Sequence, residues 1–229
     1  LAQRICLITN SDLWYICPMR HVIWLFLLLP VLMVCSNGKR SDMNVYAADH
    51  AAIEYFGRFD FSEKERPKVW NPGAYVRFTF SGTRCELTLI DEMRYGSYHN
   101  YISIVVDGGK PKRIKLTDRI NELVLAEGLA EGEHEVLICK DTESNIGFIQ
   151  FGEIRCDQLV ERARSKKPII EFIGDSITCG NGNDTVAIPC GKGEWYDQHN
   201  AYLAYGPLTA RTLDAEYLLS SFSGIGVYK

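Results

Sequence analysis

The chain has 229 residues, of which 46% are hydrophobic and 11% aromatic, so it can bury a folded core in one or two domains. Its formal net charge is −4, and its lysines and arginines are interspersed with acidic residues. These values exclude a disordered chain and argue against a nucleic-acid-binding protein.

The first 35 residues differ in character from the rest. Residues 19–35 begin with a methionine and a basic Arg-His pair, which an apolar run over residues 22–34 follows. The run has the length of a signal-peptide hydrophobic region and is shorter than the roughly 20 residues that span a membrane. We therefore expect a signal peptide at residues 19–35, beginning at Met19. Residues 1–18 are then an upstream extension that is not native to the protein.

The end of this signal is followed by a polar tether, residues 36–52. The pattern resembles a bacterial lipoprotein signal, which is cleaved before a cysteine that is then lipidated, here Cys35. Leu32 suits that pattern, whereas Met33 and Val34 are larger than its usual residues, so secretion without lipidation is the alternative. We expect an exported protein, periplasmic or at the cell surface, that meets a membrane only through a lipid anchor.

The cysteines that follow Cys35 are odd in number, so they do not describe a full disulfide framework. Cys179 and Cys190 flank a short loop, and export would favour a disulfide between them. The alternative is that the cysteines are small buried apolar residues. No cysteine–histidine spacing indicates zinc, and we expect neither a metal nor a cofactor. The set consists of Cys85, Cys139, Cys156, Cys179 and Cys190.

Residues 53–157 have the pattern of short strands separated by turns. The stretch AYVRFTFSG alternates, with Val76, Phe78 and Phe80 on one face. A hairpin signal, DGG, and further strands follow at the spacing of an all-β sandwich. We therefore expect a β-sandwich here, followed by a charged linker at residues 158–168.

Beyond the linker, the order strand, helix, strand predicts an α/β domain with a parallel sheet in residues 169–229. Its first strand is a buried Ile169–Ile173 and its second Glu216–Phe222, with a helix around residues 201–213 between them. Such sheets bind ligands beyond the carboxyl ends of their strands. Because two strands and a helix cannot cover both faces of a sheet, we expect this segment to be less firmly folded than the sandwich.

Ser176 lies in the turn that follows the first strand of this sheet. It is either a helix N-cap, worth about 1 kcal/mol, or a nucleophile. A nucleophilic serine needs a base to take its proton and backbone amides to hold the oxyanion. Its own amide and that of Gly224, after the second strand, are candidate donors.

Two blocks of sequence suggest a family. FIGDSITCG resembles the nucleophile block of the SGNH (GDSL-type) hydrolases, and SGIG resembles their second block. A β-sandwich followed by these blocks is similar to carbohydrate esterase family 2, which includes acetyl xylan esterases. Members join an N-terminal jelly roll to an SGNH domain and remove acetyl groups from plant-wall polysaccharides. The resemblance implies that Ser176 is the nucleophile, that the amides of Ser176 and Gly224 form the oxyanion hole, and that Asp175 shapes the turn.

The resemblance also places the family's asparagine and histidine blocks after its second block, where this sequence ends. We therefore expect a C-terminally truncated SGNH domain without its base histidine, which is inactive or weakly active by itself and comes from the front of a longer gene. His199, near Asp197, is the local alternative for a base, but we interpret it as a loop histidine. We interpret the remaining ones, His50, His99 and His134, as structural or exposed.

Trp195 and Tyr196 precede the predicted helix and are candidate substrate-binding residues. Trp70 and Tyr75 are sugar-stacking candidates, although aromatic residues on a sandwich strand are more often core. The implied activity is serine acyl-enzyme hydrolysis of acetyl esters on an acetylated polysaccharide or oligosaccharide. The alternative is a carbohydrate-binding or structural β-sandwich with a vestigial hydrolase half. The sequence does not indicate an oligomeric state.

Overall fold

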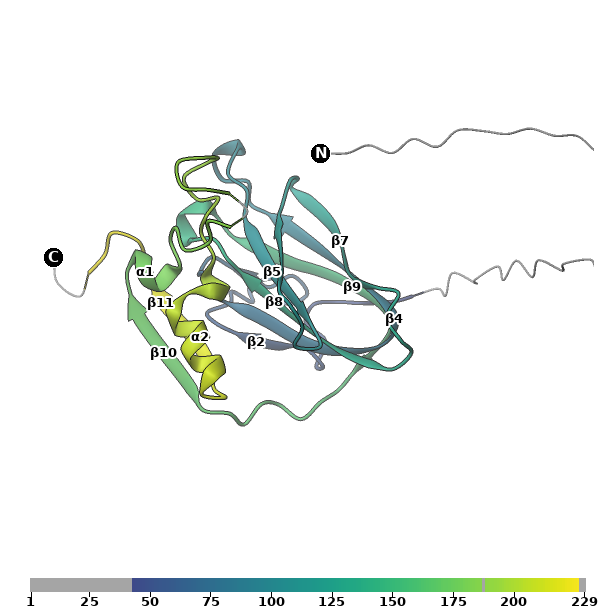
Figure 1. The fold of residues 1–229 in the computed structure, drawn as a ribbon. Helices are drawn as coiled ribbons and strands as arrows, with labels where there is room; N and C mark the ends of the chain where they lie inside the picture. Colours follow the sequence, from purple (N-terminus) through teal and green to yellow (C-terminus); the bar gives the residue numbers. More distant parts are fainter. Residues whose placement is uncertain (1–42, 187, 227–229) are drawn as a thin grey trace, which may run out of the picture. The chain divides into compact units, whose positions relative to one another are not determined.

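The computed structural model describes residues 43–186 and 188–226 (Figure 1). The predicted extension, signal peptide, lipid site at Cys35 and most of the tether lie outside these residues. In the described part of the chain, no helix is long and apolar enough to cross a membrane. The described residues belong to one compact unit.

Nine strands of the described chain form one antiparallel network, which confirms the predicted β-sandwich. The order along it is β1-β9-β4-β8-β5-β6, with β2 and β7 also paired to β4, and β3 to β9. The strands are β1 (Asn44–Tyr46), β2 (Glu54–Phe56), β3 (Lys68–Val69), β4 (Tyr75–Asp91), β5 (Tyr101–Val106), β6 (Lys112–Lys115), β7 (Ile120–Glu127), β8 (Glu133–Lys140) and β9 (Ile149–Val160).

Strand β4 is long enough to have two different neighbours on one side. Its first half pairs with β8 and its second half with β7. The change comes next to Gly82, whose φ of +110° is a conformation that side chains with a Cβ rarely adopt. A Cβ at Gly82 would also lie 2.3 Å from Oδ2 of Asp157. Gly82 therefore allows β4 to leave one partner strand and join the next.

The sandwich core follows the alternation in the sequence. Val76, Phe78 and Phe80 are buried together, as predicted. Cys85 on β4 lies opposite Cys156 on β9, and both are free and fully buried. Contact with Cys156 and burial raise the pKa of the Cys85 thiol. These two cysteines are therefore small core residues, the second of the two interpretations above.

The sandwich extends beyond both predicted limits. Strand β1 lies within the predicted tether and pairs with β9 along the register Asn44↔Cys156. Strand β9 itself runs to Val160, inside the predicted linker. A strand as short as β1 carries too little alternation to be recognised in a sequence, and it forms because β9 offers it a free edge.

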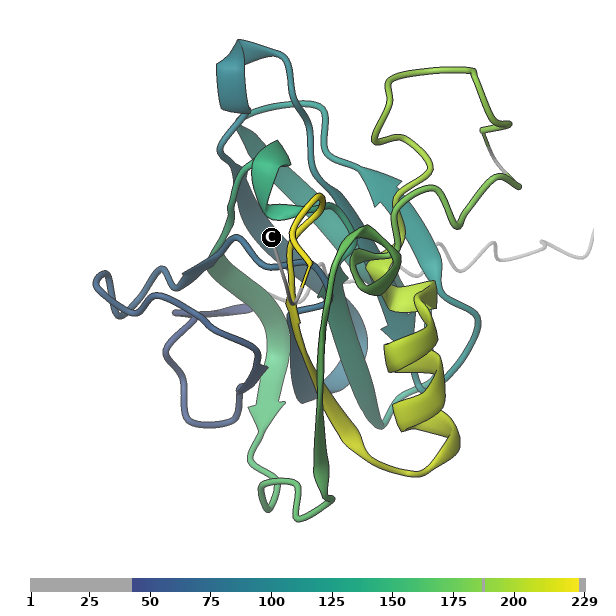
Figure 2. The ribbon, with the colours of Figure 1, turned by 90° about the vertical axis from the view of Figure 1, so that its left-hand side faces the viewer.

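The second half contains the expected parallel pair of strands. Strand β10 (Ile169–Gly174) pairs with β11 (Glu216–Ser221) from Ile169↔Glu216 to Gly174↔Ser221 (Figure 2). The predicted helix is split, because Ala204 has the extended ψ of 156° between a short helical turn and the main helix. The helical segments are η1 (Arg94–Gly96), η2 (Ser144–Ile146), α1 (Ser176–Cys179), η3 (Ala201–Leu203) and α2 (Tyr205–Thr212).

Strand β10 is half-buried on one face and mostly exposed on the other. Ile170 and Phe172 pack into a cluster shared with α2 and the sandwich. Ile169 and Ile173, on the other face, are 59% and 71% exposed. The prediction of a buried strand over Ile169–Ile173 is therefore corrected, because this strand alternates between half-buried and exposed residues.

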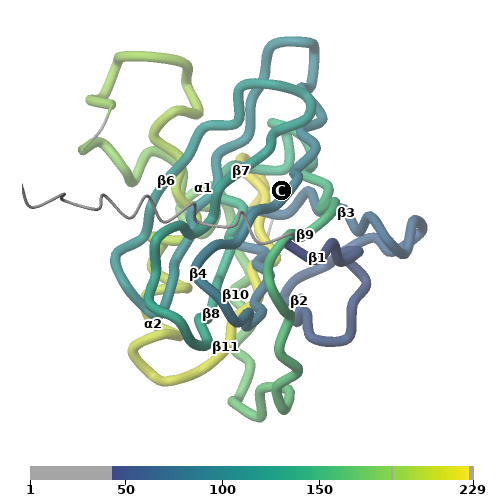
Figure 3. Tube along the Cα trace, turned by 90° about the vertical axis from the view of Figure 1, so that its right-hand side faces the viewer, coloured from purple at the N-terminus to yellow at the C-terminus, as the bar shows by residue number. Residues whose placement is uncertain are grey.

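The sandwich covers the buried face of β10 and β11 (Figure 3). Tyr75 packs against Tyr217, with ring centroids 4.7 Å apart. The Tyr75 hydroxyl donates to Oε2 of Glu216 at 2.5 Å, and Arg77 pairs with Glu216 at 2.9 Å. We expected a loosely folded second half because two strands and a helix cannot cover both faces of their own sheet. In the structure, the sandwich packs against one face of the β10–β11 sheet.

Candidate functional site

The turn after β10 presents Ser176 at the start of a short helix. The N-cap of α1 is Asp175, whose carboxylate accepts a hydrogen bond from the amide of Ile177 at 3.0 Å. Ser176 is the first helical residue, so the cap interpretation applies to Asp175 and not to Ser176. The Ser176 side chain is partly exposed and forms no hydrogen bond with another described residue. Its hydroxyl is therefore available to a substrate.

The end of α1 is held by close backbone contacts. Gly180 ends the helix in the left-handed conformation, with φ of +78°, and the Asn181 amide donates to the Ser176 carbonyl at 2.9 Å. A Cβ on Gly180 would lie 2.5 Å from the carbonyl oxygen of Asn200. The turn that carries Ser176 is thus packed against the chain that leads into α2.

Gly224 follows the second strand at the same end of the sheet. The amide of Phe222 donates to the Gly174 carbonyl at 3.2 Å, which joins the two strand ends. Gly224 itself is exposed, with φ of +76° and open space where a Cβ would stand. Ser176 and Gly224 therefore follow neighbouring strand ends, as the sequence predicts.

A cavity of about 690 Å³ opens at these strand ends. It includes the residues directly before Ser176 and directly after Gly224, and the sandwich forms its other wall. Its lining residues are Arg58, Trp70, Asn71, Ser144, Ile173, Gly174, Asp175, Ser220, Ser221, Phe222, Ile225 and Gly226.

His199 lies in the interior of the fold. It is fully buried, and its Nδ1 lies 3.5 Å from Oε1 of Glu143. Burial lowers the pKa of His199, so the imidazole is neutral. No hydrogen bond joins His199 to Ser176 within the described residues. The interpretation of His199 as a loop histidine is consistent with this placement.

Asp197, the other half of that candidate pair, anchors the loop between α1 and η3 to the sandwich. Its carboxylate accepts from the Tyr101 hydroxyl at 2.8 Å and from the Lys115 ammonium at 3.0 Å. Burial opposes ionisation, but hydrogen bonds, first from the Glu194 amide and then from Lys115 and Tyr101, lower the pKa of Asp197. Asp197 is therefore a structural anion and not a partner of His199.

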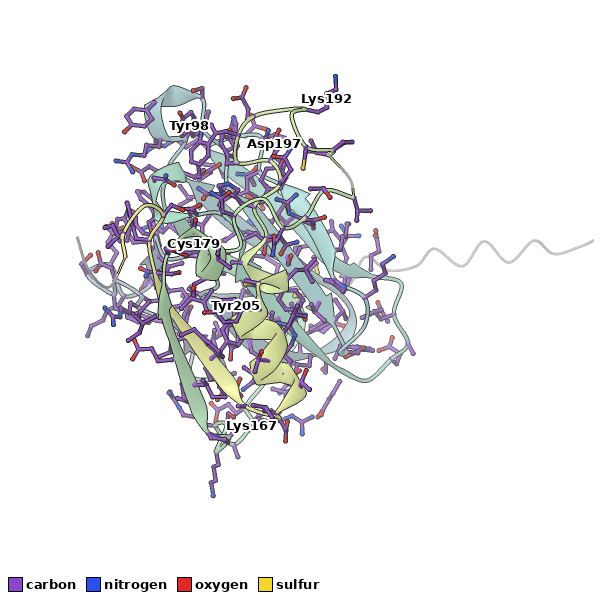
Figure 4. All side chains as sticks on the ribbon, turned by 60° about the vertical axis from the view of Figure 1, so that its left-hand side comes forward. Tyr98, Lys167, Cys179, Lys192, Asp197 and Tyr205 are labelled. Atoms are coloured by element: carbon purple, nitrogen blue, oxygen red, sulfur yellow. The ribbon has the colours of Figure 1, made fainter. Side chains whose placement is uncertain are left out.

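The two aromatic residues of this loop have different positions. Trp195 is 48% exposed and is open to a ligand. Tyr196 is buried, and its hydroxyl accepts a hydrogen bond from the His99 amide at 3.3 Å. The prediction of a substrate contact is therefore corrected for Tyr196, which supports the loop from beneath. Figure 4 labels Tyr98 and Asp197, which lie near each other in the upper part of the view.

The other predicted residues lie as follows. Cys179 and Cys190 are both free, because Cys179 is buried against the Ser221 hydroxyl at 3.2 Å while the loop carries Cys190 to the surface. The predicted disulfide is not present in this structure. Tyr75 is core, whereas Trp70 lines the cavity. In the described part of the chain, no group of histidine, cysteine and carboxylate side chains is suited to hold a metal ion.

Sequence reasoning missed the contacts by which the sandwich holds the Ser176 turn. Oε1 of Glu143, at the start of η2, accepts from the Asn181 side chain at 2.9 Å. Lys140 is also fully buried and donates to the carbonyl oxygens of Thr142 and Glu143, which fixes this turn. The available signal was a cluster of charged residues, KDTE, directly after the apolar strand β8.

Comparison with known proteins points to one family. Residues 55–162 match the family described as "Carbohydrate esterase 2 N-terminal". The "Cellulase/esterase CelE" of Acetivibrio thermocellus is 33% identical over 183 residues, which cover 78% of this chain and 21% of that protein. An "Acetylxylan esterase / glucomannan deacetylase" of Cellvibrio japonicus is 32% identical over 164 residues, which cover 69% of this chain and 42% of that protein.

The likeness extends to solved structures. A family two carbohydrate esterase from Clostridium thermocellum, solved in complex with cellohexaose, superposes with a TM-score of 0.66 and is 34% identical. The match covers 76% of this chain and 52% of that one. The chain therefore spans about half the length of this structure and less than half of the two relatives above.

Proposed function

Since the chain is a carbohydrate esterase family 2-like protein, we propose that it takes part in hydrolysing O-acetyl esters on a polysaccharide. One of the two named relatives is described as an acetylxylan esterase and glucomannan deacetylase, and one of the solved relatives was solved in complex with cellohexaose. These names support a β-linked polysaccharide as the substrate class. The observation that carries the proposal is the placement of Ser176, on a strand-to-helix turn at the edge of a cavity, with Asp175 in the capping position.

The proposed reaction uses Ser176 as a nucleophile of the SGNH type. Its Oγ attacks the acetyl carbonyl, and the amides of Ser176 and Gly224 hold the oxyanion that forms. Collapse of this intermediate releases the sugar hydroxyl and leaves acetyl-Ser176, which water then hydrolyses to acetate. A base must take the serine proton and pass it to the leaving sugar oxygen. In the described residues no histidine is bonded to Ser176, so we place the base outside them.

The test is acetate release from acetylated glucomannan. It uses the chain together with whatever coding sequence follows Lys229 in its source. Ser176→Ala should abolish release, and Ser220→Ala, a serine on the same rim of the cavity, should retain it. His199→Gln should also retain release, because His199 is fully buried and is not hydrogen-bonded to Ser176 in the described residues. Release that survives Ser176→Ala, or no release from the extended chain, would overturn the proposal.

The exported, lipid-anchored state is also a proposal, supported by the sequence of residues 19–35. Expression in bacteria with labelled palmitate should label the wild-type chain and leave Cys35→Ala unlabelled. Secretion of an unlabelled wild-type chain would instead identify the non-lipidated alternative.

A further inference from the structure

A group of aromatic side chains, two of them exposed and one half-buried, lies apart from the strand ends that carry Ser176. Tyr95 and Tyr98 come from the loop between β4 and β5, and Trp195 comes from the loop between α1 and η3. Tyr95 is 75% exposed and Trp195 is 48% exposed. We call these three residues the aromatic platform.

The platform rings form a connected row. Tyr95 and Tyr98 have ring centroids 5.4 Å apart, and Tyr98 and Trp195 have centroids 6.3 Å apart. Their planes are inclined by 86° and 71°, so the rings meet edge to face. Tyr196 lies beneath, with its ring 5.3 Å from that of Tyr98. Two halves of the chain thus contribute to one surface.

The backbone holds this row in place at an energetic cost. Tyr95 has φ of +58° and Met93 has φ of +49°, a left-handed conformation that is costly for side chains of this size. A strained backbone that turns a tyrosine toward solvent brings no gain in core packing. The loop is nevertheless fixed, because the buried Asp91 carboxylate accepts from the amides of Met93 and Asn100.

The same row continues toward the cavity at the strand ends. Arg94 lies over the ring of Tyr95, with its guanidinium carbon 5.2 Å from the ring centroid. Nη1 of Arg94 also faces the carbonyl oxygens of Ser144 and Asn145, at 3.5 and 3.4 Å. Ser144 is in turn part of the cavity lining. A linear ligand on the platform could therefore extend toward Ser176.

We propose that the aromatic platform binds a linear β-linked polysaccharide and feeds it toward the Ser176 cavity. The C–H faces of pyranose rings are apolar and stack on tyrosine and tryptophan rings, which give large, rigid contact areas at low entropic cost. A row of rings can contact several successive sugars of a linear chain, whereas a single small ester would contact only one ring. The ligand class rests on the proposed function, but binding requires neither Ser176 nor its base.

The test is native gel electrophoresis of the full chain in gels with and without soluble glucomannan. Wild type and Ser176→Ala should be retarded equally by the polysaccharide. Tyr95→Gly and Trp195→Ala should each bind at least about threefold more weakly, the loss expected for one aromatic contact. Tyr95→Gly also removes the left-handed strain at this position, so weaker binding by this variant cannot be attributed to added backbone strain.

Phe61→Ala is the matched control, because Phe61 is a 46% exposed aromatic residue in the loop between β2 and β3, outside the platform. It should bind as wild type does. No retardation of wild type, wild-type binding by Tyr95→Gly, or an equal loss in Phe61→Ala would each overturn the platform. Retardation of the chain, together with no acetate release from the extended chain, would retain the platform and count against the esterase proposal alone.

Discussion

The side-chain amide of Asn181, two residues after α1, donates to Oε1 of Glu143 at 2.9 Å across the boundary between the two halves. Glu143 is almost fully buried and belongs to the sandwich. The residues that position Ser176 are therefore not confined to the segment that carries it.

Asn181→Ala should lower the free energy of unfolding by about 1–3 kcal/mol, because it leaves a buried carboxylate oxygen without its donor. Urea unfolding followed by far-UV circular dichroism measures this change. Glu143→Gln is the control, since a glutamine oxygen can still accept from Asn181, and it should cost less. An Asn181→Ala protein as stable as wild type would show that water replaces the donor.

The two halves should unfold together. Tyr217→Ala removes a buried ring that packs on Tyr75, and we expect a loss of about 3–5 kcal/mol together with a single transition. Leu213→Ala, at a 61% exposed position just beyond α2, should change stability by less than about 0.5 kcal/mol. Fluorescence and circular dichroism curves that do not coincide would indicate a sandwich that stays folded alone.

A matched pair of glycines separates backbone strain from close contact. Gly180 and Gly182 have φ of +78° and +66°, but only Gly180 would place a Cβ against the Asn200 carbonyl. Gly182→Ala should cost about 1 kcal/mol, the usual strain of a left-handed alanine, and Gly180→Ala clearly more. Thermal melts of the two variants make the comparison. Equal losses would mean that the Gly180 turn shifts to accept the methyl group.

Acid should destabilise the fold through His199. Burial lowers its folded-state pKa below the ordinary 6.5, so the unfolded chain takes up a proton first as the pH falls. The stability that the neutral ring provides is therefore complete above pH 6.5 and is lost as the pH falls through the lowered pKa. Glu143, Arg113, Lys140 and Asp197 are the charged groups that act on this ring.

His199→Gln removes the titrating group and should flatten this part of the profile. The difference in unfolding free energy between wild type and variant should change by up to about 1.4 kcal/mol per pH unit below pH 6.5. Urea titrations at several pH values between about 4.5 and 7.5 provide the measurement. Parallel profiles for the two proteins would mean that another group controls the acid response.

Much of the architecture could be predicted because alternating and apolar runs of neighbouring residues determine where its strands form. The alternation around Val76, Phe78 and Phe80 predicted a sandwich strand, and the apolar runs at 169 and 216 predicted the parallel pair. Ser176 and Gly224 were placed at neighbouring strand ends because parallel strands share an edge.

The errors and omissions concern contacts between distant segments. Nothing near Tyr196 in the sequence shows that Tyr98 and the His99 amide lie above it and bury it. Likewise, Glu143 and Asn181 are far apart in the chain and meet only after both halves have folded. Such pairs depend on packing, which a single sequence does not display.

The buried carboxylate of Glu216 has a practical consequence for recombining parts of related proteins. It is contributed by the second half, while its partners Arg77 and Tyr75 are contributed by the sandwich. A chimaera that takes only one half from a related protein would leave either the buried Glu216 carboxylate or the Arg77 guanidinium without its partner from the other half. An exchange of segments between related proteins should therefore transfer Tyr75, Arg77 and Glu216 together.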